Sequence, residues 1–390
     1  MTKPIADWLV IGGGITGAAV AYELQQTGYS VILLEKSPRP ENATSLGYGG
    51  LGFWSGRTSW WRTLAKESRD LHQSFAERWD TELRELPLLL TVDHEEDPTA
   101  ITNQFSDCEI PPQWLSPKEA KSLEPELNIS EIQGAFQAFH GQVNGFKLQQ
   151  AYLREFQVAG GRVYTGAVIH LTPQNLSQQS SCPKWLITTH HTNYLTSNVL
   201  IAAGSGSRKL LDGLSLHLPL YFTEEQVLIS QPQPLQLRTM VMSATLQRLP
   251  LETAIAKHWN TPAPDSLPAI IDTGAIQMPD GRLFIGQRTS APKNDPSSPA
   301  SAEQALRSQL RKILPRIADL PATLRTCQVT FSPREQPLVG PIHGHPGLYL
   351  FNGFTSPLLL VPPLARHFAQ QLRGQSSHSL IQSLDTVDCS

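Results

Sequence analysis

The stretch DWLVIGGGITGAAVAYELQQTGYSVILLEK, which runs from Asp7 to Lys36, decides the fold. Its first part, Asp7–Ile11, predicts a short buried strand, and a run of glycines follows. Helix-forming residues then occupy Ala18–Gln26, and Ser30–Leu34 predicts a second buried strand. A strand, a glycine-rich turn, a helix and a second strand make one βαβ unit of about 30 residues.

The glycines of this unit have the spacing GxGxxG at Gly12, Gly14 and Gly17. The first allows a tight turn, the second lets the backbone approach a pyrophosphate, and the third lets the helix pack closely on the strand. The helix start offers N–H groups and a partial positive charge to the phosphates. Glu35 ends the second strand, where a carboxylate can bind both ribose hydroxyls and repels the 2′-phosphate of NADP. The whole set predicts a dinucleotide site and disfavours a glycine turn without function.

Two later segments favour FAD over NAD. Asn198–Gly204 predicts a buried strand that ends in small residues, which would let the chain pass close to a flavin. Leu348–Gly353 repeats this pattern before a predicted helix, whose N-terminal dipole could stabilise negative charge on a reduced flavin. Either segment alone is equally well explained as an ordinary βα turn of the same sheet.

The composition sets broader limits. A length of 390 residues favours two domains, and a net charge of −3 gives no electrostatic footprint for nucleic acid or an anionic membrane. No apolar run is long enough for a spanning helix. The cysteines are too scattered for a metal motif or a disulfide framework, and they are Cys108, Cys182, Cys327 and Cys389. We therefore expect a cytoplasmic protein without a membrane span or a metal. The pattern does not predict the oligomeric state.

Other segments differ in how clearly they predict structure. The stretch 87–117 is rich in proline and acidic residues and shows no strong period. At the end of this stretch, Ser116 is placed to cap a helix that has Pro117 at its first position and Glu119 three residues beyond the cap.

The chain resembles the D-amino-acid oxidase, glycine oxidase and sarcosine oxidase family of FAD enzymes in several segments that occur in the family's order. The opening βαβ unit is similar to the family's start, but it is common to many flavoproteins. More specific is the ordered set of later segments, namely TSLGYGG at 44–50, LSPKEAKSLEPEL at 115–127, GAFQAFHGQVNGFKL at 134–148, the strand ending at Gly204, SPREQPLVG at 332–340 and GFTS at 353–356.

This resemblance implies an α/β fold in which a Rossmann-type FAD-binding domain is built from discontinuous segments. An α+β substrate domain with an antiparallel sheet is interleaved between them. The implied boundaries are 1–85, 145–212 and 325–390 for the FAD-binding domain, and 86–144 and 213–324 for the substrate domain. The implied FAD-binding residues are Gly12, Gly14, Ile15, Thr16, Gly17, Glu35, Lys36, Thr44, Ser45, Gly49, Gly50, Val168, Ala203, Gly204, Gly353, Phe354, Thr355 and Ser356.

The residues expected to bind the substrate depart from the family. Two arginines that hold the substrate carboxylate in family members correspond here to Val329 and Thr355, and a lysine of sarcosine oxidase-like members corresponds to Leu360. A simple α-amino acid is therefore disfavoured as substrate, unless another arginine takes over. The candidates, each also explicable as a structural or solvated residue, are Arg57, Arg62, Arg288 and Arg334.

The resemblance implies oxidation of an amine or amino-acid-derived substrate by hydride transfer to flavin N5, and it identifies no catalytic side chain. Two alternatives stay open: a flavoprotein that acts on a larger substrate, and a non-catalytic FAD-binding protein. Cys327 lies at the spacing of a cysteine that is bonded to the flavin in sarcosine oxidase-like members. We favour the simpler interpretation that it is a small buried cysteine in a strand.

Overall fold

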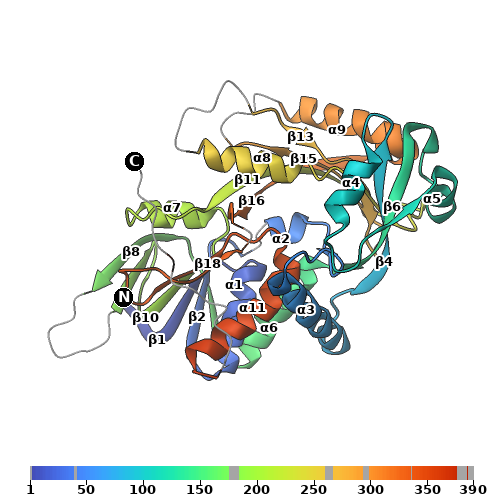
Figure 1. Cartoon of the computed structure of the whole chain (residues 1–390). Coiled ribbons are helices and arrows are strands. Elements are labelled where there is room, and N and C mark those ends of the chain that lie inside the picture. Colours follow the sequence, from blue (N-terminus) through green and yellow to red (C-terminus); the bar gives the residue numbers. More distant parts are fainter. Residues whose placement is uncertain are drawn as a thin grey trace. The chain divides into compact units, whose positions relative to one another are not determined.

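The computed structural model describes residues 2–38, 42–174, 184–259, 267–292, 298–334, 336–375 and 384, with the side chains of 2–5 and 184 left out. The chain forms two compact units (Figure 1). Unit 1 contains residues 1–45, 145–222 and 329–390, and unit 2 contains 46–144 and 223–328. Each unit is therefore assembled from segments that are distant in sequence.

Unit 1 contains a sheet and the helices that cover it. Its elements are β1 (Thr2–Ile11), α1 (Ile15–Gln26), β2 (Val31–Glu35), α2 (Ala43–Leu46, which ends in unit 2), α6 (Gly145–Val158), β7 (Arg162–Thr165), β8 (Val168–Gln174), β9 (Lys184–Thr189), β10 (Asn193–Ile201), α7 (Gly206–Asp212), β17 (Leu338–Pro341), β18 (Leu348–Asn352) and α11 (Pro357–Leu372).

The sheet of unit 1 has the order β17-β18-β10-β1-β2-β7, and β9 and β8 continue from β10 along a second path. β1 is parallel to both β2 and β10, and β10 is parallel to β18. The predicted βαβ unit is thus confirmed, with α1 beginning at Ile15 rather than Ala18. The carboxyl ends of β1, β10 and β18 lead into the glycine-containing segments, which is where parallel sheets bind nucleotides.

The helices α1, α6 and α11 lie together on one face of this sheet (Figure 1). Trp8 of β1 is buried there, with its ring centroid 4.7 Å from that of Tyr349 and 5.9 Å from that of Phe368. On the opposite face, Leu9 and Ile11 pack into a second apolar core. Alternate residues of β1 are therefore buried on both faces, which is typical of a central parallel strand.

Unit 2 contains the second sheet. Its elements are β3 (Gly50–Leu51), α3 (Ser59–Arg78), β4 (Arg84–Asp93), α4 (Pro98–Phe105), β5 (Gln113–Leu115), α5 (Pro117–Leu123), the 3-10 helix Ile129–Glu131, β6 (Ile132–Gln142), β11 (Tyr221–Ser230, which begins in unit 1), β12 (Met240–Ser243), α8 (Arg248–Lys257), β13 (Ile270–Ile271), β14 (Ala275–Gln277), β15 (Leu283–Ser290), α9 (Pro299–Ile313), α10 (Pro315–Ala318) and β16 (Ala322–Phe331, which ends in unit 1).

The second sheet has the order β16-β11-β15-β14-β12-β4-β6-β3, with β13 beside β15 and β5 beside β6. Its pairs are mostly antiparallel, as expected, but β4 and β12 are parallel. One face packs under α9, where Leu228 and Ile285 meet Leu306. The opposite face carries Val227 and Phe284 in a separate core. The predicted α/β class is confirmed, with mixed sheets in both units.

The strand β4 contradicts the expectation of no regular period over 87–117. Its apolar residues run continuously instead of alternating, because β4 lies inside the sheet between β6 and β12. Pro87 also made a strand harder to predict, since proline has no N–H to donate to the hydrogen bonds between strands. Pairing with β12 begins at Leu88, one residue later, so Pro87 has a partner strand only on the β6 side. The helix expected after Ser116 is confirmed as α5, with both hydrogen bonds of its capping box.

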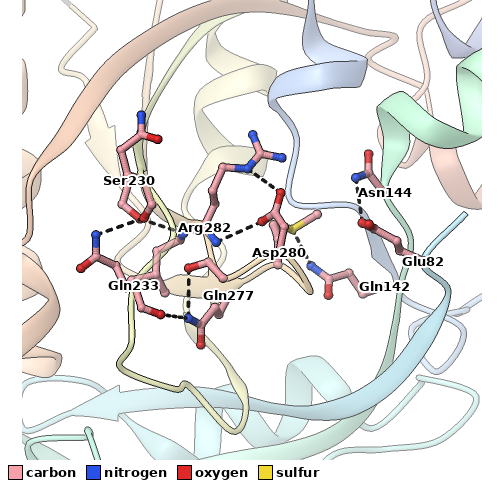
Figure 2. A network of polar contacts seen from close by, with 12 residues as sticks. Glu82, Gln142, Asn144, Ser230, Gln233, Gln277, Asp280 and Arg282 are labelled. Carbon is pink, nitrogen blue, oxygen red and sulfur yellow. Dashed lines mark hydrogen bonds and ion pairs between the residues drawn. The ribbon is translucent and has the colours of Figure 1, made fainter.

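The hairpin between β14 and β15 is held by buried amide groups (Figure 2). Gln277 Oε1 accepts from the N–H of Leu237 at 2.9 Å, and Gln277 Nε2 donates to the carbonyl of Leu235 at 2.8 Å and to that of Gly281 at 3.1 Å. Arg282 Nε bonds the Asp280 carboxylate at 2.7 Å. These groups satisfy one another within unit 2 and leave the turn with a structural role.

Candidate functional site

The glycine turn ends where α1 begins, and the N-cap residue of that helix has no side chain to cap it. Gly14 is the N-cap residue with φ −65° and ψ −178°, and it has no side chain to accept a bond from the first turn. The first helical N–H groups have no partner inside a helix. Ile15 donates to Thr44 Oγ1 at 3.1 Å, and the helix ladder starts with the bond from Ala18 to Gly14. Among the described residues, the N–H groups of Thr16 and Gly17 have no partner, so they could donate to an anion.

The three glycines are needed for different reasons. A Cβ on Gly12 would lie 2.4 Å from the carbonyl oxygen of Ala202, and one on Gly17 would lie 1.8 Å from the carbonyl oxygen of Gly12. Close packing is therefore sufficient to explain why both positions are glycine. A Cβ on Gly14 would meet Thr44 Oγ1 at 3.4 Å, an ordinary contact. The fold leaves the space beside Gly14 open, which fits a phosphate held there by backbone N–H groups.

Glu35 lies against the glycine turn. Its Oε2 accepts from the N–H of Gly13 at 2.6 Å and its Oε1 accepts from that of Ser37 at 3.1 Å. Each carboxylate oxygen can accept a second hydrogen bond, because it has two lone pairs. Glu35 is half-buried, whereas Lys36 is exposed. The structure thus brings Glu35 to the turn and leaves the Lys36 side chain in solvent.

The short helix α2 supplies a second contact to the turn. Thr44 accepts the bond from Ile15, and Asn42 Oδ1 in turn accepts from the N–H groups of Thr44 at 3.0 Å and Ser45 at 3.2 Å. Asn42 was not among the predicted residues. Its signal was available, because asparagine commonly caps the backbone two or three residues further along the chain.

Gly49 and Gly50 lie in unit 2, where close packing explains both. Gly49 has φ +76°, and a Cβ on it would lie 1.9 Å from the carbonyl oxygen of Val143. A Cβ on Gly50 would lie 2.6 Å from His140 Nε2. Trp54 Nε1 donates to His140 Nδ1 at 3.1 Å, and burial lowers the pKa of His140 to about 4. His140 is therefore a neutral, packed acceptor at pH 7.

Asn352 connects the two later glycine segments of unit 1. Its Nδ2 donates to the carbonyl oxygen of Gly204 at 2.9 Å and to Ser207 Oγ at 2.7 Å. Its Oδ1 accepts from the N–H of Gly353 at 2.8 Å. Ser207 Oγ also accepts from the N–H of Ala203 at 3.1 Å. The predicted residues Ala203, Gly204 and Gly353 are thus brought together by a side chain that the sequence analysis did not single out.

The segment after Gly353 leads into α11. Phe354 is buried against Phe351, with 5.2 Å between their ring centroids. Thr355 and Ser356 are half-buried, and Ser356 starts α11 without a side-chain cap. Val168 begins β8, opposite Thr189 of β9. All of these predicted residues belong to unit 1, and Gly49 and Gly50 alone of the predicted set belong to unit 2.

The arginines considered as replacements for the carboxylate clamp have other partners or face solvent. Arg62 bonds the carbonyl oxygens of Gly56 and Asp107 and the carboxylate of Glu109. Arg57 and Arg334 are exposed. Val329 lies in β16, and Leu360 lies in α11 with only 1% of its surface exposed.

Arg288 is held on one face of the second sheet. It is 5% exposed and lies opposite Gln226, whose Oε1 accepts from it at 2.8 Å. The neighbouring pair, Glu225 and Thr289, is hydrogen-bonded at 2.6 Å. Because successive side chains of a strand point to opposite faces, Arg288 and Glu225 lie on opposite faces.

Glu225 is part of a buried charged cluster in unit 2. Its carboxylate accepts from Thr223 at 2.7 Å and from Gln287 and Thr289 at 2.6 Å. Burial raises the pKa of Glu225 to about 7, although these hydroxyls and the nearby Arg248 act in the other direction. Arg248 itself pairs with Glu252 on α8 at 3.1 Å.

Cys327 lies half-buried in β16 near this cluster. Burial raises the pKa of its thiol to about 12, and the Glu225 carboxylate acts in the same direction. The thiolate is the nucleophilic form, so the environment holds Cys327 in its unreactive state. This supports the interpretation of Cys327 as a packed cysteine.

Comparisons with known proteins identify the family to which the chain belongs. The family model described as FAD dependent oxidoreductase matches residues 7–371. A glycine oxidase of Pseudomonas aeruginosa is 24% identical over 94% of this chain and 94% of its own length. A glycine oxidase of Geobacillus kaustophilus is 28% identical, over 61% of this chain and 64% of its own length, so the match spans less than two thirds of that relative.

Solved structures share the fold. The crystal structure of the Geobacillus kaustophilus glycine oxidase superimposes with a TM-score of 0.77 at 21% identity, over 97% of this chain and 96% of that one. A dithionite-reduced L-α-glycerophosphate oxidase of Mycoplasma pneumoniae with FAD bound gives a TM-score of 0.76 at 16% identity, over 99% and 97%. None of the helices in the described part of the chain has the length and apolarity that crossing a bilayer requires.

Proposed function

The chain belongs to the FAD dependent oxidoreductase family and is an FAD-dependent oxidoreductase related to glycine oxidases; from this premise we propose that it oxidises the C–N bond of a small amine or amino-acid-derived molecule. FAD, when bound, supplies the hydride acceptor N5. The observation that carries the cofactor assignment is the start of α1, where the N-cap residue Gly14 has no side chain to accept a bond, beside the Glu35 carboxylate.

In this proposal the backbone of unit 1 holds the cofactor. The N–H groups of Gly14, Thr16 and Gly17 bind the pyrophosphate, because a helix N-terminus favours anions. Glu35 binds the ribose hydroxyls through its remaining lone pairs. We propose that the other predicted FAD-binding residues also contact the cofactor. Asn352 positions two of them, Gly204 and Gly353.

We propose that the substrate is not a small α-amino acid. It either has no carboxylate or is a bulkier molecule. Val329, Thr355 and Leu360 supply no cation, and Arg288 has a structural partner on the face opposite Glu225. A buried carboxylate without a paired cation is strongly disfavoured. The same absence supports the second candidate, a flavoprotein that acts on a larger molecule. We also propose a cytoplasmic location, which the free thiols of Cys108 and Cys327 support.

The test has two stages. The purified protein is denatured, the released nucleotide is identified, and apoprotein is reconstituted with FAD. Detection of NAD alone, or no FAD binding after reconstitution, would overturn the cofactor assignment. The holoprotein is then mixed anaerobically with a panel of amines while the flavin absorbance is followed. Bleaching by a small amine supports the proposal, and full FAD loading without bleaching by any of them favours a larger substrate or a non-catalytic flavoprotein.

A further inference from the structure

A buried glutamine on α6 contacts the middle of the glycine turn. Gln149 is 1% exposed, and its Nε2 donates to the carbonyl oxygen of Gly13. The N–H of Gly13 donates to Glu35 Oε2 at 2.6 Å. Side chains from α6 and β2 therefore hold both polar backbone groups of one glycine, which lies between Gly12 and Gly14.

The bond from Gln149 determines where the next N–H group points. The peptide that joins Gly13 to Gly14 is trans, so its C=O and N–H groups point in opposite directions. A carbonyl held toward α6 thus places the N–H of Gly14 on the other side, at the start of α1. Glycines on both sides give the peptide unusual rotational freedom, because no Cβ restricts it. A hydrogen bond is needed to keep one orientation.

We propose that Gln149 is a positioning residue for the FAD pyrophosphate, which fixes the Gly13–Gly14 peptide so that the N–H of Gly14 faces the phosphate. This inference rests on the proposed binding of the pyrophosphate at the glycine turn. Gln149 acts on the cofactor through the backbone, and it contributes to the orientation of the donor before FAD arrives. Binding is then stronger because less conformational freedom is lost on association.

A second observation separates this role from simple packing. Gln149 Oε1 is buried and has no hydrogen-bond partner among the described residues. An unpaired buried acceptor destabilises a fold, so the glutamine is not optimal for stability alone. Replacing it with leucine leaves the carbonyl of Gly13 unpaired, but it also removes the unpaired Oε1. The two effects oppose each other in the apoprotein, whereas only the first affects FAD binding.

The experiment measures FAD dissociation constants of apoprotein variants by quenching of flavin fluorescence. Gln149→Leu should weaken FAD binding about tenfold, the value of one ordinary hydrogen bond, with little change in the apoprotein Tm. The matched control is Gln150→Leu, the same substitution at the exposed neighbouring residue, which should bind FAD like the wild type.

A second variant gives a pH signature. In Gln149→Glu an ionised carboxylate cannot donate to the carbonyl of Gly13, so at pH 8 FAD should bind more weakly than to Gln149→Leu. A protonated carboxyl group can donate, so the affinity relative to wild type should recover as the pH is lowered toward 5. This recovery also tests the inference if the leucine variant does not fold.

The outcomes separate this inference from the cofactor assignment. If wild-type apoprotein binds no FAD, the proposed function fails. If wild type binds FAD and Gln149→Leu binds it equally well, the positioning role is overturned. The role is also overturned if the ratio of the Gln149→Glu and wild-type dissociation constants does not change with pH.

Discussion

The helices α1 and α5 begin in opposite ways. At α5, Ser116 and Glu119 close a capping box, with bonds of 2.8 Å from the N–H of Ser116 to the Glu119 carboxylate and 3.4 Å from the N–H of Glu119 to Ser116 Oγ. At α1, Gly14 provides no cap. The start of α5 is thus satisfied by its own side chains, whereas the start of α1 has donors that we propose bind a ligand.

Gly14→Val tests this difference between the two helix starts most strongly. A Cβ at Gly14 is compatible with the fold, but valine would fill the space that we assign to the phosphate. FAD affinity should fall by about a hundredfold or more, because charge-assisted hydrogen bonds of about 1.5–3 kcal/mol each are lost. Flavin titration and circular dichroism of the apoprotein measure binding and folding separately.

The control for that variant is Gly17→Ala, whose Cβ would lie 1.8 Å from the carbonyl oxygen of Gly12. It should disrupt the fold itself. Full flavin loading of Gly14→Val would show that the pyrophosphate lies elsewhere.

The comparison extends to substrates, because the buried Arg288 of unit 2 is engaged with Gln226 within the protein. Glycine and D-alanine should reduce the flavin about a hundredfold more slowly than a carboxylate-free amine of similar size. Two missing charge-assisted bonds would cost about 3–6 kcal/mol if they were additive, and each ~1.4 kcal/mol is tenfold in rate. Anaerobic stopped-flow reduction by glycine, sarcosine, D-alanine and the amine is the measurement.

Efficient reduction by glycine would contradict this prediction. Arg288→Met and Arg334→Met would then identify a replacement clamp, if one of them removed the activity. Arg316→Met is the matched control, since Arg316 pairs with Glu126 elsewhere in unit 2.

The buried carboxylate of unit 2 offers a pH test. Burial raises the pKa of Glu225 to about 7, above its value in the unfolded chain. Between these two pKa values the folded state therefore binds more protons than the unfolded state. Its contribution to the free energy of unfolding is fully present below pH ~4.5 and is lost as the pH rises to about 7.

Glutamine does not titrate, so the difference in unfolding free energy between wild type and Glu225→Gln should change by about 3 kcal/mol from pH 4 to pH 8. Urea denaturation at a series of pH values measures it. Glu224→Gln, at the neighbouring half-buried residue, is the control. A constant difference would show that the pKa of Glu225 is the same in the folded and the unfolded protein.

The smallest expected effect concerns the capped helix. Ser116→Ala removes the cap of α5 and should lower the free energy of unfolding by about 1 kcal/mol. FAD affinity should not change, in contrast to Gly14→Val. Thermal unfolding and flavin titration together check this, with Ser122→Ala on the exposed face of the same helix as the control. An equal loss from both serines would show that the capping box is not the source of the stability.

Local patterns predicted the βαβ unit and the start of α5 well, because their signals lie within a few residues. The strand β4 was missed because its identity depends on two partner strands and its apolar run does not alternate. Asn352 and Gln149 were missed for a related reason. Each bonds the backbone of a segment more than a hundred residues away in the chain, and no spacing rule shows such a contact.

Gly49 and Gly50 teach a different lesson. Their resemblance to a family segment suggested a cofactor contact, and their surroundings in unit 2 already require glycine for packing. A glycine in a family motif can thus be explained by a cofactor contact or by close packing, and sequence alone does not distinguish the two. The proposed contact with FAD stays a prediction for both residues.

The order of strands in unit 1 has a consequence for synthesis on the ribosome. β1 pairs with β10, and β10 pairs with β18, so the sheet is completed by residues 348–352. A nascent chain carries the entire glycine turn early, but one edge of β1 stays open until β10 has emerged. Open strand edges promote misassociation, and distant pairings form slowly. Newly made chains should therefore depend on chaperones until nearly the whole polypeptide has left the ribosome.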